Sequence, residues 1–249
     1  HEDDKKAIGE LVSAILNDEP LKMRSLASLF HIDIASIHSM WVFQNDGLET
    51  AQLEELAGYA KMYCSTAFAG VFGKYAVLFS NPVKELQDAD AIISYGQNMM
   101  HENCAVSYFS SLETTSDVRK AFLLFEQAAA DAEHIFPKKN RYSEGDLQFA
   151  GKCRERINLG ETSVKEALSP LNVLKDLRDA EAMLDTLSVY LLDTQSSILR
   201  TAEQMIVHKN TVKYRLGAMS DRLGYSVGEM PASWPIYLAV GVSRLIHEK

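Results

Sequence analysis

The sequence predicts an α/β domain followed by an all-helical domain, and the patterning along the chain indicates this fold class. Up to about residue 145, short apolar runs typical of strands alternate with segments of helical periodicity. From about residue 146 onward, only helical periodicity remains. A polar, turn-rich stretch at 137–146, PKKNRYSEGD, separates the two patterns. We therefore expect a helical segment at 1–30, an α/β sandwich at 31–145 and a helical domain at 146–249.

The α/β part contains the pattern of one sheet with helices packed on it. Strand-like apolar runs occur at His38–Phe43, on both sides of Gly70 and Gly73 within 64–80, and at Ala105–Phe109. Helical patterns cover most of 1–30 with a break at Pro20, then 53–63, then 82 to about 101, and then a long stretch from a Ser116 cap to about Ile135. The order β-α-β-β-α-β-α has long crossovers, which predicts parallel pairing and a mixed sheet.

The helical part contains two short helices separated by a tight turn. Three helices are expected before them, two short ones at 146–157 and 163–168 and a longer one at 180–192. Apolar positions then predict a helix from Ile198 to Met205, and Ile206-Val207-His208 interrupts it. Asn210 or Thr211 is expected to cap a second helix over about 210–222. Two such helices predict a helix-turn-helix over about 196–223.

The second helix of the pair has one apolar stripe and one polar face. With Val212 at 0°, the apolar residues Leu216, Met219 and Leu223 lie within about 40° of it. The opposite side holds Asn210, Tyr214 and Thr211 at about 160°, 200° and 260°, with Lys213 and Arg215 on the flanks at about 100° and 300°. Such a helix could read base edges and neutralise phosphates, although many solvated helices share the pattern.

The charge distribution is compatible with nucleic acid binding at this one place. The chain has a formal net charge of −9. Residues 1–145 carry all of the excess, with 12 basic and 21 acidic residues, whereas 146–249 hold 13 of each. Within 196–222 there are five basic residues, including Lys209, and two acidic ones. An acidic protein with one local basic patch can bind DNA through that patch.

The same residues resemble the C-terminal helix-turn-helix of the PucR/CdaR family of bacterial transcription regulators. The family pattern "TL..YL" followed by "TA..L..HrNTv.YRL" stands here as Thr186-Leu187, Tyr190-Leu191, Thr201-Ala202, Met205, His208-Lys209-Asn210-Thr211-Val212 and Tyr214-Arg215-Leu216. Two departures are mild: Lys209 replaces an arginine and Met205 replaces a leucine. The resemblance implies a cytoplasmic regulator of a metabolic operon that binds double-stranded operator DNA. A small-molecule effector is a further expected partner.

We expect six residues to contact DNA: Lys209, Asn210, Thr211, Lys213, Tyr214 and Arg215. The cations would neutralise phosphates, while Asn210, Thr211 and Tyr214 would read bases. A homodimer is expected because one short recognition helix reads too little sequence to be selective.

Residues 31–145 resemble the degenerate, GGDEF-like cyclase domain that precedes this helix-turn-helix in the family. The likeness lies in the element order and in the hairpin. An active cyclase carries Gly-Gly-Asp/Glu-Glu-Phe in that hairpin, whereas this chain has Phe72-Gly73-Lys74-Tyr75. Two-metal phosphoryl transfer needs carboxylates at that turn. The resemblance therefore implies a regulatory or dimerisation domain without catalysis, cofactor or metal.

Other candidate sites are weaker. His101-Glu102-Asn103-Cys104 offers metal-ligand types, but no second pair lies at a suitable spacing. Cys64, Cys104 and Cys153 do not form a disulfide framework, which favours a reducing compartment. No apolar run approaches the roughly 20 residues of a membrane span, so a membrane protein is excluded.

Two alternatives to a DNA-binding regulator stay open. One is a small-molecule or nucleotide sensor whose helix-turn-helix mediates contact with a protein, and the other is a residual nucleotide-handling enzyme. The chain opens HEDDKKAIGE, without Met. This start favours a piece of a longer protein from which a preceding sensor domain, frequent in the family, is missing.

Overall fold

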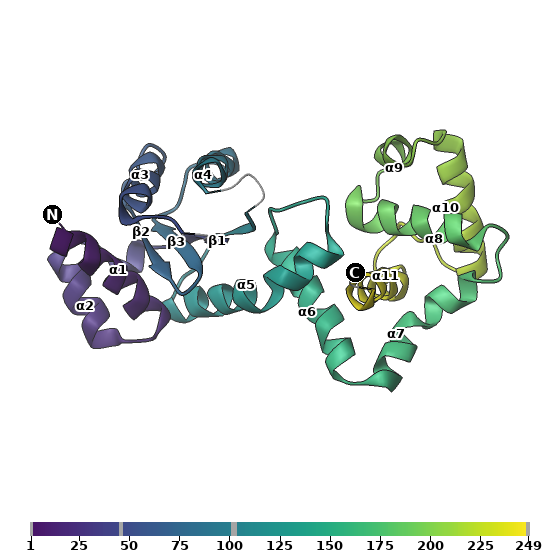
Figure 1. Cartoon of the computed structure of the whole chain (residues 1–249), viewed down its shortest axis with the longest axis horizontal. Coiled ribbons are helices and arrows are strands. Elements are labelled where there is room, and N and C mark those ends of the chain that lie inside the picture. Colours follow the sequence, from purple (N-terminus) through teal and green to yellow (C-terminus); the bar gives the residue numbers. More distant parts are fainter. Residues whose placement is uncertain (1, 45–46, 101–103, 248–249) are drawn as a thin grey trace. The chain divides into compact units, whose positions relative to one another are not determined.

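The computed structural model describes residues 2–44, 47–100 and 104–247 (Figure 1). The predicted turn at Asn45-Asp46 and the metal-ligand candidates at 101–103 lie outside these residues. The chain forms two compact units. The α/β unit comprises His1–Ala129 and Asn140–Leu147, and the helical unit comprises Ala130–Lys139 and Gln148–Lys249.

The α/β unit is built on a four-stranded antiparallel sheet. Strands β1 (Ser39–Gln44), β2 (Ala67–Phe72), β3 (Tyr75–Ser80) and β4 (Val106–Phe109) lie in the order β2-β3-β1-β4. β1 pairs antiparallel with both β3 and β4, and β2 pairs antiparallel with β3. The predicted parallel pairing in a mixed sheet is therefore wrong. The returning strand of the hairpin, β3, lies between β1 and β2, so these two strands are not neighbours. This is the split βαβ arrangement of ferredoxin-like domains.

Helices cover both faces of this sheet (Figure 1). On one face, α3 (Thr50–Ala60) and α4 (Leu86–Met99) bury a core that includes Trp41, Phe43 and Leu78. On the other face lie α1 (Glu2–Leu16) and α5 (Thr115–Ile135), and α2 (Pro20–Leu29) packs against α1. A Cβ built on Gly70 of β2 would meet the Val12 side chain at 2.9 Å, so the glycine allows α1 to approach the strand closely.

Two helix starts differ from the sequence prediction because reciprocal caps set them. The predicted Ser116 cap of α5 is wrong, and Thr114 has that role. The Thr114 hydroxyl accepts a hydrogen bond from the Asp117 N–H at 3.2 Å, and the Asp117 carboxylate accepts one from the Thr114 N–H at 2.9 Å. The helix expected from Pro82 begins only at Leu86, where Glu85 and Asp88 form a capping box.

The helical unit contains the C-terminal helices of the chain. They are α6 (Glu144–Asn158), which begins in the α/β unit, α7 (Glu161–Leu174), α8 (Ala180–Ser188), the π-helical turn η2 (Val189–Asp193), α9 (Ile198–Met205), α10 (Lys209–Leu223) and α11 (Trp234–Ile246). α7 extends past the predicted 163–168 and through Pro170. The proline removes a donor from the helix, and the Glu166 carbonyl accepts a hydrogen bond from the Ser169 hydroxyl at 2.8 Å. α10 packs against α7, α8 and α9.

Within the described part of the chain, no helix combines the length and apolar character needed to cross a membrane.

Candidate nucleic-acid interface

The helix pair α9 and α10 is joined by the three residues Ile206–His208. Ile206 has left-handed backbone angles, φ 55° and ψ 46°, at the C-terminal end of α9. The N–H of Val207 donates to the Ala202 carbonyl at 3.0 Å, which closes the last turn of the helix. The predicted break at 206–208 and the helix-turn-helix around it are confirmed.

His208 caps the second helix. Its backbone is extended, and its Nδ1 accepts a hydrogen bond from the Asn210 N–H at 3.2 Å. The expected caps Asn210 and Thr211 are therefore wrong, since α10 begins at Lys209 and both residues lie in its first turn. Among the residues that the structure describes, neither of their side chains has a hydrogen-bond partner, which leaves both polar groups available to a ligand.

Three of the four residues in the apolar stripe of α10 are buried as the wheel predicts, and the fourth, Leu223, is half-buried. Val212, Leu216 and Met219 have exposed fractions of 0%, 7% and 0%. Burial of this side fixes the rotation of the helix about its axis. The opposite side of α10 is consequently held toward solvent.

Four of the six predicted DNA-contacting residues are exposed on the first two turns of α10. Lys209, Asn210, Lys213 and Tyr214 are exposed, and Tyr214 retains 71% of its accessible surface. Thr211 is half-buried beside them. No ion pair with another described residue engages Lys209 or Lys213. The structure thus brings together two cations, an amide, a hydroxyl and a phenol at the N-terminal half of one helix.

Arg215, the sixth residue, is placed differently. Its Nη1 donates to Oγ1 of Thr186 at 2.9 Å, and the Thr186 hydroxyl donates to the Ala182 carbonyl at 2.7 Å. Thr186 is completely buried in α8, and Arg215 is half-buried. Arg215 therefore links the recognition-helix candidate to the helix beneath it.

A buried polar network supports α9, and the sequence prediction missed it. The hydroxyls of Thr194 and Thr201 are 2.7 Å apart, and the Thr201 hydroxyl is 2.7 Å from the Ser197 carbonyl, to which it donates. Thr201 belongs to the motif quoted from the sequence, but a motif position does not reveal its partner. Such a network, with its members satisfied, gives the first helix one defined position.

A bidentate ion pair holds the turn before α9 to the last helix. Arg244 of α11 donates to both carboxylate oxygens of Asp193 at 2.7 Å and also to the Ile135 carbonyl at 2.8 Å. The Asp193 side chain is only 4% exposed. No sequence signal pointed to this pair, because its members are far apart along the chain.

The hairpin of the α/β unit places Lys74 at the turn between β2 and β3. Gly73 has φ 59°, and the Lys74 Nζ lies 5.6 Å from the centroid of the Tyr75 ring. Over residues 2–44, 47–100 and 104–247, no three or more His, Cys, Asp or Glu side chains come together as metal ligands.

Comparison with known proteins finds a family match over the helix-turn-helix. Residues 183–242 match the PucR C-terminal helix-turn-helix domain. The purine catabolism regulatory protein of Bacillus subtilis (strain 168) is 39% identical over 69 residues, a match that covers 28% of this chain and 13% of that protein. The crystal structure of a regulator of polyketide synthase expression from Bifidobacterium adolescentis aligns over 100% of this chain and 96% of that chain, with 17% identity and a TM-score of 0.45.

Proposed function

We propose that this chain, whose C-terminal domain is a PucR-type helix-turn-helix, is a transcription regulator that binds operator DNA through α10 and has no catalytic activity. The observation that carries the proposal is the arrangement of α10. A buried apolar stripe holds the helix in place, while Lys209, Asn210, Lys213 and Tyr214 are exposed at its N-terminal half. The recognition helix of a helix-turn-helix contacts base edges with its N-terminal residues.

The six predicted side chains of α10 have proposed roles that follow from their chemistry. Lys209 and Lys213 neutralise phosphates and set the register of the protein on the duplex. Asn210 pairs with N6 and N7 of an adenine, and Thr211 contacts a thymine methyl. Tyr214 adds a hydroxyl and a ring at the base edges. Arg215 stabilises the position of α10 against α8, because its guanidinium donates a hydrogen bond to Thr186.

We further propose a cytoplasmic homodimer that binds two half-sites, controls a metabolic operon and responds to a small-molecule effector. One helix reads only a few base pairs, and dimeric helix-turn-helix proteins place half-sites about 34–36 Å apart. The α/β unit would be a GGDEF-like regulatory or dimerisation domain. Its βαββαβ order and the turn at Phe72–Tyr75, which has no carboxylate, support this assignment.

A second candidate function is contact with a protein through the same helix-turn-helix. Two large apolar side chains of this region are exposed: Ile206 retains 91% of its accessible surface and Leu199 retains 60%. Apolar exposure of this kind suits a protein partner. Association that does not change with salt concentration would favour this function over DNA binding.

The test is fluorescence anisotropy of the full chain with a labelled duplex from upstream of its own gene. A scrambled duplex of the same composition serves as the control, and both are titrated at two salt concentrations. We expect the native duplex to bind at least about 100-fold more tightly, with an affinity that falls as salt rises. Equal and weak binding to both duplexes would contradict the proposed operator recognition.

A further inference from the structure

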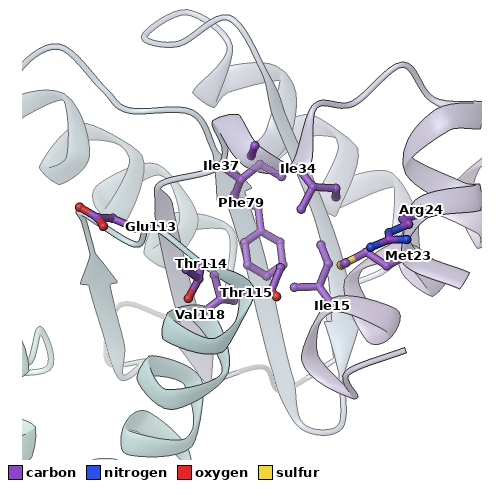
Figure 2. Close-up of a pocket in the computed structure, with 11 residues that line it drawn as sticks. Ile15, Met23, Arg24, Ile34, Ile37, Phe79, Glu113, Thr114, Thr115 and Val118 are labelled. Carbon is purple, nitrogen blue, oxygen red and sulfur yellow. The ribbon is translucent and has the colours of Figure 1, made fainter. Parts of the chain in front are cut away.

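The α/β unit contains a pocket between its N-terminal helices, its sheet and the start of α5 (Figure 2). The pocket has a volume of about 270 Å³. Its floor consists of Ile15, Ile37, Phe79 and Val118, none of which is more than 6% exposed. All of its lining residues belong to the α/β unit, so the pocket is complete within that unit.

The size and lining of the pocket suit a small apolar group. Protein interiors are close-packed, and an open apolar space of this size forfeits the packing contacts that its floor could make. A dry apolar cavity of about 150 Å³ is already large enough to hold benzene. The pocket can therefore accept a ring of that size together with a short side chain.

The polar groups at the edge of the pocket include one positive and one negative side chain, and they lie on opposite sides. Figure 2 shows Arg24 on one side, beside Met23, and Glu113 on the opposite side. Among the described residues, the Arg24 guanidinium has no ion-pair partner, whereas Lys22 on the same helix pairs with Glu10 at 3.6 Å. A carboxylate can therefore bind at Arg24. Glu113 opposite would repel a second negative charge.

We propose that this pocket is a binding site for a small monocarboxylate with an apolar body. The apolar body would lie on the floor around Phe79, and the carboxylate would bind the Arg24 guanidinium. Glu113 would select against dicarboxylates. Ligand binding here involves none of the residues assigned to DNA contact. It can therefore be tested without DNA, and its failure would be distinguishable from a failure of the proposed DNA binding.

The test is isothermal titration calorimetry of the full chain with compounds that share one ring and one chain length. Phenylacetate carries a negative charge, phenylacetamide is neutral, and phenethylamine is positively charged. We expect phenylacetate to bind with a Kd of about 1 mM or below. We expect the amide to bind about fivefold more weakly, because it lacks the charge-assisted hydrogen bond to Arg24, and the amine to bind more weakly than the acid.

Three variants locate the site. Arg24→Gln should make the acid and the amide bind alike, while Lys22→Gln, a matched loss of a cation on the same helix, should leave the preference unchanged. Ile34→Trp, at the half-exposed rim, should fill the pocket and abolish binding of all three compounds. Thermal melting by circular dichroism checks that each variant is folded. Absence of binding by all three compounds, or unchanged phenylacetate binding in folded Ile34→Trp, would overturn the proposal.

Discussion

At the scale of single residues, Asn210 and Arg215 lie on the same helix but have different surroundings. The Asn210 side chain is exposed and has no hydrogen-bond partner among the described residues. The Arg215 guanidinium is bound to the buried Thr186 hydroxyl. We therefore assign base recognition to Asn210 and support of the helix to Arg215, and each assignment has its own test.

Asn210→Ala should relax the preference for one base pair of the operator. A bidentate pair between asparagine and adenine contributes about 1–3 kcal/mol of discrimination. Competition binding against duplexes altered at one base pair each measures this preference. Asn172→Ala, at an exposed asparagine of α7, is the matched control and should bind like wild type. Wild-type base preference in Asn210→Ala would remove the proposed base contact.

Arg215 and Thr186 should be energetically coupled. A double-mutant cycle with Arg215→Gln and Thr186→Val isolates their interaction, because valine keeps the shape of threonine and removes the hydroxyl. We expect a coupling of about 1 kcal/mol in the free energy of unfolding. This value is smaller than that of a fully buried charged hydrogen bond, because Arg215 is partly exposed to solvent. Urea denaturation of the four proteins measures it. Additive effects of the two changes would show that the hydrogen bond does not stabilise the fold.

The sequence contained part of the information about these two residues. On the helical wheel, Arg215 at about 300° lies only about 40° from Met219, while Asn210 at about 160° lies far from the apolar stripe. The wheel thus predicts that Arg215 borders the buried side. It could not identify Thr186 as the partner, because that contact joins two helices and depends on tertiary packing.

At the scale of elements, the turn between α9 and α10 carries local backbone strain. Ile206 has left-handed backbone angles, which a β-branched residue adopts at a cost, and its side chain is 91% exposed. Ile206→Gly should raise the free energy of unfolding by about 1 kcal/mol, since the strain is relieved and little packing is lost. Thermal or urea denaturation measures the change.

Gly224, at the C-terminal end of α10, allows the reverse substitution, from glycine to a residue with a Cβ. Gly224 has φ 81° in the same C-terminal position of its helix. Gly224→Ala should lower the free energy of unfolding by about 1 kcal/mol. A destabilised Ile206→Gly would show that the isoleucine side chain makes stabilising contacts that outweigh its backbone strain.

Periodicity, which is a local signal, predicted the helices of the helix-turn-helix correctly, whereas several helix caps and the sheet order were predicted wrongly. The break at 206–208 and the buried stripe of α10 follow from periodicity, which is a property of the segment itself. The Thr114 cap could also have been found, because Asp117 stands three residues after it. The sheet order could not, since long crossovers allow both adjacent strands and strands separated by a third.

At the scale of the whole molecule, the two units share α5 and α6, so their boundary crosses helices rather than a single linker. The polar stretch at 137–146 marks a change of pattern in the sequence. It did not reveal that residues 130–139 belong with the helical unit and 140–147 with the α/β unit. Contacts between distant segments decide this assignment, and a single sequence does not specify them.

Cys153 offers a probe of the folded helical unit. Burial raises the pKa of its thiol to about 12, and the nearby Asp131 carboxylate adds to the shift. The thiol is therefore almost entirely protonated between pH 7 and pH 9 and should resist iodoacetamide until the unit unfolds. Mass spectrometry after labelling, with and without urea, measures this protection. Labelling of native Cys153 at the rate of a free cysteine would contradict its burial.

The central claim, that α10 binds operator DNA, is tested most directly by the salt dependence of binding in wild type and Lys213→Ala. With the native upstream duplex, Lys213→Ala should weaken binding and lower the slope of log affinity against log salt by about one unit. Lys165→Ala, which removes an exposed lysine of α7, should match wild type. Wild-type affinity and slope in Lys213→Ala would show that α10 does not contact the phosphates, and would contradict the proposed recognition helix.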